Sequence, residues 1–134
     1  MEISVYKEYV DMEKSLTLEE MEKLHQEMIA EIGNDEDALE IYRDLVIAAN
    51  KYADYRAKWC TWDREEKLEK DASRTMCHNS LIMNFNMLAR FLKSQRKEAA
   101  WREVLGEEGE HPYNRKRIGD FACYIVFVNS ICAR

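Results

Sequence analysis

The C-terminal segment constrains the fold of this chain more than any other feature. Between Ile118 and Arg134 the charged residues are Asp120 and Arg134 itself, and the 13-residue stretch from Phe121 to Ala133 has no charge. A helix that is apolar on all sides must be surrounded by its own domain, by a partner or by lipid. The stretch is too short to cross a bilayer, which needs about 20 residues. We therefore expect it to form a helix at the centre of the protein core.

The length and composition favour a single helical domain. The chain has 134 residues, which is enough for one domain with a sizeable core. One proline and four glycines are few breakers for this length, and no segment alternates apolar and polar residues over a useful length. The sequence predicts an all-α single domain over residues 1–134, a bundle of four to six helices with the apolar C-terminal helix in its core.

Helix boundaries in the N-terminal half follow from local signals. A first helix is expected from about Ile3 to Lys14. Thr17 and Glu20 have the spacing of a capping box at the start of a second helix, and Gly33 is a natural terminator for it. The acidic run 34–37 then supplies an N-cap and a favourable first turn for a third helix, which continues to about Trp59.

The second half is less sharply marked. Thr61 or Asp63 could cap a new helix, or the third helix could continue. An apolar stripe resumes at 73–92, and we expect its part from Ile82 to Leu92 to be the main neighbour of the terminal helix. A short helix is expected from Ala99 to Leu105, and Asn114 is expected to cap the terminal helix.

Cysteine usage and the N-terminal residues indicate a reducing, cytoplasmic setting. The four cysteines include no Cys-x-x-Cys pair, and Cys60, Cys123 and Cys132 lie in apolar or aromatic runs where a reduced thiol behaves as a small hydrophobe. The N-terminus has neither the basic nor the apolar part of a signal peptide. We expect free thiols.

The charge is acidic overall but uneven along the chain. The net charge is −6. Residues 1–54 carry 15 acidic and five basic side chains, whereas residues 55–134 carry 11 acidic and 15 basic ones. We expect the acidic helices to lie against the basic part. The acidic total argues against nucleic acid and anionic membranes as partners.

One group of polar residues suggests an acid–base site. On a helix, Asp71, Arg74 and His78 fall along one stripe with Ile82 and Phe85, so His78 continues an apolar face. A half-buried imidazole near a carboxylate and a guanidinium can be a tuned acid or base. The structural alternative, which we favour, is that His78 makes a hydrogen bond within the core and Asp71 pairs with Arg74.

A second polar line lies beside the first. Asn79, Asn86 and Arg90 share a helix face, and Asn129 sits in the apolar terminal helix. These residues could form a pocket for a small ligand. We favour a structural network in which the asparagines bond across the interface between the two helices, because buried amides need partners.

The start of the terminal helix is basic. Arg115, Lys116 and Arg117 oppose the helix dipole, which prefers anions at that end. An anion site there is one interpretation. The interpretation that we favour is local pairing with the acidic residues just upstream, Glu107, Glu108 and Glu110.

Metal and cofactor chemistry has little support in the sequence. The three histidines are scattered, and a Glu-x-x-His pair such as Glu22 with His25 on an acidic surface helix is not enough for the di-metal site of a bundle, which needs further carboxylates. Phosphate loops, nucleophile elbows and nucleotide-binding fingerprints are absent. We expect no metal and no cofactor.

The leading functional interpretation is a non-enzymatic module that acts through contacts with another protein or with itself. It depends on the absent catalytic motifs, the charge asymmetry and the seven methionines, seven tyrosines and three tryptophans. The alternative is a small-molecule or anion-binding protein, or an enzyme, with a polar site between the helix at 71–92 and the C-terminal helix. Its candidate ligand-binding residues are Arg74, His78, Asn79, Arg90, Arg115 and Arg117.

Overall fold

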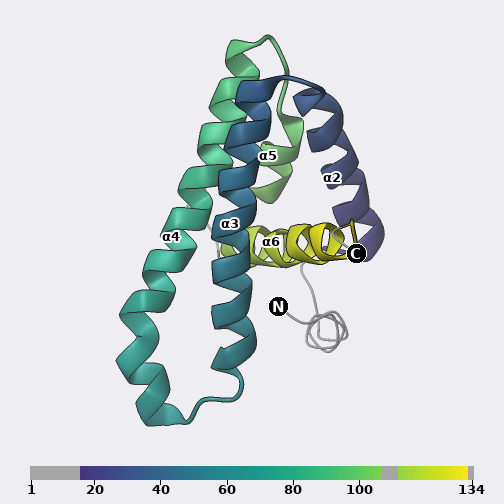
Figure 1. Cartoon of the computed structure of the whole chain (residues 1–134). Coiled ribbons are helices and arrows are strands. Elements are labelled where there is room, and N and C mark those ends of the chain that lie inside the picture. Colours follow the sequence, from purple (N-terminus) through teal and green to yellow (C-terminus); the bar gives the residue numbers. More distant parts are fainter. Residues whose placement is uncertain (1–15, 107–111, 133–134) are drawn as a thin grey trace.

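The described part of the protein is all-α, as predicted. The computed structural model describes the backbone of residues 16–106 and 112–132, and the side chains of 16–106 and 117–130. These residues form five helices and no strand (Figure 1). The helices are α2 (Leu18–Ile32), α3 (Glu36–Trp59), α4 (Arg64–Ser94), α5 (Ala100–Leu105) and α6 (Pro112–Cys132). The helix expected from Ile3 to Lys14 lies outside the described residues, as do Glu107, Glu108 and Glu110.

The local signals at the two ends of α2 act as the sequence indicates. The Thr17 backbone N–H donates to Glu20 Oε1 at 3.0 Å, and the Glu20 N–H donates to Thr17 Oγ1 at 3.1 Å, which completes the capping box. At the other end Gly33 has a φ of 54°, a conformation that glycine adopts without steric strain.

Helices α3 and α4 form a long antiparallel hairpin, whose tip extends past α6 in Figure 1. Asp35 caps α3 by accepting from the N–H groups of Asp37 and Ala38. At the tip the structure selects Asp63 over Thr61 as the cap of α4, since the Asp63 carboxylate accepts from the Glu66 N–H at 2.9 Å. Thr61 instead closes α3.

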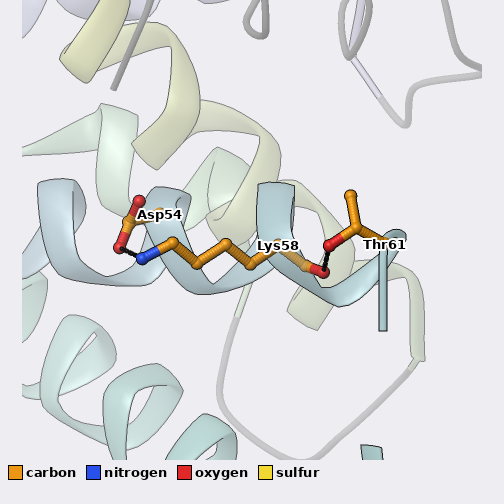
Figure 2. A network of polar contacts seen from close by, with 3 residues as sticks. All are labelled: Asp54, Lys58 and Thr61. Atoms are coloured by element: carbon orange, nitrogen blue, oxygen red, sulfur yellow. Dashed lines mark hydrogen bonds and ion pairs between the residues drawn. The ribbon is translucent and has the colours of Figure 1, made fainter. Parts of the chain in front are cut away.

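Polar contacts hold the last turn of α3. Figure 2 shows Lys58 lying between Asp54 and Thr61. The Lys58 ammonium is 2.9 Å from Asp54, and the Thr61 hydroxyl donates to the Lys58 carbonyl at 2.6 Å. Such an exposed i,i+4 ion pair is screened by solvent and contributes little to stability. It helps α3 to continue to its end but does not determine the hairpin.

Helix α6 is the core helix that the sequence predicts. Every residue from Ile118 to Val126 is buried, so the helix is covered on all sides over more than two turns. Phe121 and Ile125 are fully buried, and Val128 is half-buried against the core. The helix crosses the α3–α4 hairpin in Figure 1 and reaches the first turn of α2.

Two expectations about α6 are wrong. It packs chiefly on α3 rather than on the Ile82–Leu92 part of α4, which it meets mainly through the stacked rings of Phe85 and Phe121. It also begins at Pro112, so Asn114 lies inside the first turn and is not the N-cap. Proline is well suited to that first position because it has no N–H that needs an acceptor.

Helix α5 is held against α2 by one carboxylate. Glu31 accepts from the Ala99 N–H at 3.0 Å and from the Trp101 indole N–H at 2.8 Å. Ala99 has a left-handed φ of 49° and offers no side-chain cap, so Glu31 supplies the missing acceptor at the start of α5. This is how an acidic residue of α2 meets the later part of the chain, through backbone and indole donors and not through an ion pair.

Candidate functional site

Five of the six predicted ligand-binding residues have described side chains, and they have different neighbours. Arg74 is exposed, and its guanidinium carbon lies 4.5 Å from the centre of the Trp59 ring, a cation–π contact. The described ion pairs do not include the expected pairing of Arg74 with Asp71, which is exposed. His78 is half-buried, and its ring centre lies 5.5 Å from that of Tyr52.

Of the other four predicted residues, Asn79 directly follows His78, and Arg90 and Arg117 lie elsewhere. Asn79 and Arg90 are exposed on α4, three turns apart. Arg117 is half-buried on α6 and donates from Nη1 to the Val104 carbonyl at 3.1 Å. The side chain of Arg115 lies outside the described residues. The described contacts of the set are thus with Trp59 for Arg74, with Tyr52 for His78 and with Val104 for Arg117.

A buried ion pair near His78 was missed by the sequence analysis. Arg56 Nη2 lies 2.9 Å from Asp120 Oδ1, with 22% of the Arg56 side chain exposed and none of Asp120. The pair joins α3 to α6 between residues that are 64 positions apart in the sequence. Asp120 was noticed as the one charge near the start of the apolar segment, but its partner could not be found from spacing.

Close backbone approach makes this contact possible. A Cβ atom on Gly119 would lie 2.5 Å from the Tyr52 hydroxyl and 2.6 Å from Arg56 Nη1, so a larger residue would push α6 away from α3. Burial raises the pKa of Tyr52 well above its ordinary value, with Cys123 and Asp120 adding to the effect. Tyr52 is therefore a neutral hydroxyl group at physiological pH.

This cluster has the properties of a helix-to-helix contact. A carboxylate with no exposed surface is not accessible to a substrate, and its charge is already compensated by Arg56. Tyr52 is buried and protonated. The Asp120 carboxylate and the Tyr52 hydroxyl therefore serve the contact between α3 and α6.

A second polar cluster corrects the expected asparagine network. Asn129 donates to the Tyr42 hydroxyl on α3 at 3.2 Å and to the Ile125 carbonyl at 2.8 Å. Nε2 of His25 on α2 lies 2.9 Å from the same hydroxyl. Asn129 thus links α6 to α3 and not to α4, because α3 is the helix that α6 packs on. Burial lowers the pKa of His25 below its ordinary value, so its ring is neutral at pH 7.

Asn86 also has a partner other than the one expected. Its Oδ1 accepts from Arg102 Nε of α5 at 2.7 Å, and Arg102 Nη1 donates to the Gly106 carbonyl. Asn86 therefore helps to hold α5 on α4. The amides that the sequence placed in one interhelical line have structural roles at two separate contacts.

The surface of α4 that faces away from the core carries an unexpected apolar feature. Met76, Met83 and Met87 are 71%, 61% and 47% exposed. Their spacing of seven and four residues places them on one face of the helix. They lie within a line of exposed residues that we name the outer stripe: Glu69, Ser73, Met76, Ser80, Met83, Met87, Arg90 and Ser94.

A groove borders the outer stripe on the side of α3. It has a volume of about 330 Å³ and is lined by Ala48, Lys51 and Tyr55 from α3, and by Met76, Cys77 and Ser80 among the residues from α4. The thiol of Cys77 is buried in its wall, and Cys60, Cys77 and Cys123 are all free thiols. Met21 and Met28, by contrast, are buried in the core.

The described residues contain neither a group of metal ligands nor a membrane span. In 16–106 and 117–130 no three His, Cys, Asp or Glu side chains are grouped as metal ligands would be. Within the described helices none combines the length and apolar character that a membrane span needs.

Comparisons with known proteins add no functional assignment. No family model matches the chain, and searches of curated proteins and of solved structures find no match. The surfaces of this chain are therefore the basis for inferring its function.

Proposed function

We propose that the protein is a non-enzymatic interaction module that binds a protein helix along the outer stripe of α4. The observation that supports this most directly is the exposure of Met76, Met83 and Met87 on one helix face. Exposed apolar side chains gathered in a contiguous patch are typical of protein contact sites. Methionine is flexible and polarisable and is over-represented at such surfaces.

The shape of the surface supports a helical ligand. The outer stripe runs along α4 and has the groove against α3 beside it, so a helix lying parallel or antiparallel to α4 would contact both. Amphipathic helices commonly dock into such apolar grooves through residues spaced three and four apart.

The alternative function, a ligand or enzyme site between α4 and α6, has weaker support. Asp120 is enclosed in its ion pair, Tyr52 is buried and neutral, and Arg74 is stacked on Trp59. Arg90 is far along α4 from His78. We therefore favour the interaction surface over chemistry at that junction.

Photo-cross-linking in cells tests the proposal. A photo-reactive amino acid replaces Met83 in one variant and Leu68 in the control. Leu68 is on the same helix and is 71% exposed, but it lies off the outer stripe. We expect position 83 to cross-link to a protein and position 68 to give no specific product. An absence of specific cross-links from positions 76, 83 and 87 would contradict the proposal.

A further inference from the structure

We propose that the partner bound along the outer stripe is a second copy of this chain, with the two α4 helices packed antiparallel about a two-fold axis. This inference rests on the proposed function, since it names the partner for the same surface. The first support is periodicity. From Glu69 to Ser94 the outer stripe advances by four and three residues alternately, and all eight side chains are exposed. That spacing is the heptad pattern of a coiled-coil seam.

An antiparallel pairing brings complementary side chains together. With the two-fold axis between Leu81 and Ile82, Ser80 faces Met83 of the partner subunit, and Met76 faces Met87 of the partner subunit. The first pair sets a small residue against a large one, and the second joins two flexible apolar side chains. Both pairs occur twice, as an isologous interface requires.

Charge selects the antiparallel direction. At the N-terminal end of α4 the exposed charges are mostly acidic: four carboxylates lie between 65 and 71 against exposed Arg64 and Arg74, while the half-buried Lys67 and Lys70 lie over tryptophan rings. The C-terminal end carries exposed Arg90 and Lys93. Antiparallel packing sets each acidic end beside the basic end of the partner, whereas parallel packing would place like charges together. One helix thus carries both halves of a complementary pattern, which favours a second copy over an unrelated helix.

The groove fits the same arrangement. It lies at the level of Met76 to Ser80, which in this register is opposite Met83 and Met87 of the partner subunit. Their side chains can enter the groove beside Tyr55. Because the dimer is two-fold symmetric, the same contact fills the groove of the other subunit. Residues inserted between neighbouring side chains in this way are the knobs and holes of helix packing.

Sedimentation equilibrium over a range of concentrations tests the assembly. We expect a species of twice the 15.9 kDa chain mass that dissociates on dilution. Met83→Glu should raise the dissociation constant by about 100-fold or more, because the change occurs on both sides of the axis. Leu68→Glu adds the same charge at an equally exposed site off the stripe and should leave the constant unchanged. A wild-type chain that is monomeric up to about 1 mM would overturn the inference, as would equal effects of the two variants.

Mixed disulfide formation tests the register. In a Cys60→Ser background, Met76→Cys and Met87→Cys, which face each other in this register but lie far from their own copies, are placed in separate chains and oxidised alone and as a mixture. We expect rapid cross-linking in the mixture alone. Rapid cross-linking of either variant with itself would indicate a parallel pairing and overturn the proposed geometry.

The two proposals can fail separately. A monomeric chain that cross-links from position 83 to a different protein would leave the interaction surface standing and refute the second copy as partner. A monomeric chain without any cross-link from the stripe would refute both.

Discussion

Removal of Arg56 should destabilise the protein more than removal of the charge on Asp120. In Arg56→Met the Asp120 carboxylate stays fully buried but loses the guanidinium 2.9 Å away. Stranding one partner of a buried pair costs about 3–5 kcal/mol. In Asp120→Asn the remaining charge is that of Arg56, whose side chain is 22% exposed and can turn toward water. We expect a loss of about 1–2 kcal/mol there, the scale of a weakened hydrogen bond.

The double variant separates charge from packing. If stranded charge is the main term, Arg56→Met combined with Asp120→Asn should be at least about 1 kcal/mol more stable than Arg56→Met alone, since coupled neighbours are non-additive on that scale. Urea unfolding followed by circular dichroism measures all four proteins. With a slope of about 2 kcal/mol per molar urea, the Arg56→Met midpoint should fall by about 2 M. A fall below about 0.5 M, or a larger fall for Asp120→Asn, would refute the buried-charge argument.

Three further predictions concern the core and its polar contacts. Ile125→Ala should lower the free energy of unfolding in urea by about 2–5 kcal/mol because it leaves a cavity at a fully buried position. A loss under about 1 kcal/mol, half of the lower bound, would mean that α6 is not enclosed. Gly119→Ala should cost about 1–3 kcal/mol, since its Cβ would lie 2.5 Å from the Tyr52 hydroxyl; thermal stability unchanged from wild type would contradict the close approach. The lowered pKa of His25 means that the unfolded chain binds its proton more readily. Stability should therefore be intact above about pH 6.5 and decline as pH falls below it. His25→Gln should flatten that decline between pH 6.5 and 5.5, whereas an unchanged profile would exclude His25 as its source.

The parts of the fold that the sequence predicts are those decided by neighbouring residues. Thr17 and Glu20 are three positions apart, and their mutual hydrogen bonds depend only on the first turn of α2. Gly33 ends the same helix for an equally local reason. The uncharged terminal segment predicts its own burial because no face of it can meet water favourably.

Long-range pairing is where sequence reasoning failed. Asp120 pairs with Arg56 across 64 positions, and Asn129 bonds to Tyr42 across 87. Both contacts occur because α6 lies on α3, and at Gly119 the missing side chain leaves room for Tyr52 and Arg56. The residue pattern of one helix does not indicate which other helix it packs against. Asn129 and Asn86 were therefore expected to bond between α4 and α6, whereas their partners are Tyr42 of α3 and Arg102 of α5.

The spacing of the outer stripe is visible in the sequence, but its exposure is not. Its alternating four- and three-residue steps are visible in the printed chain, but Ser73 and Ser80 interrupt the apolar pattern, and methionine fits a core equally well. Only the exposure of Met76, Met83 and Met87 separates them from the buried Met21 and Met28.

Methionine-methyl NMR tests the central claim most directly, that two copies of the chain contact each other through the outer stripe of α4. The methyl carbons are labelled in all methionines, and spectra are recorded over a dilution series of the wild-type protein. We predict that the signals of Met76, Met83 and Met87 shift with concentration, while those of Met21 and Met28, which are at most 2% exposed, stay fixed. Signals from the three exposed methionines that stay constant across the series, or a shift shared equally by the buried pair, would contradict contact between two copies through this surface.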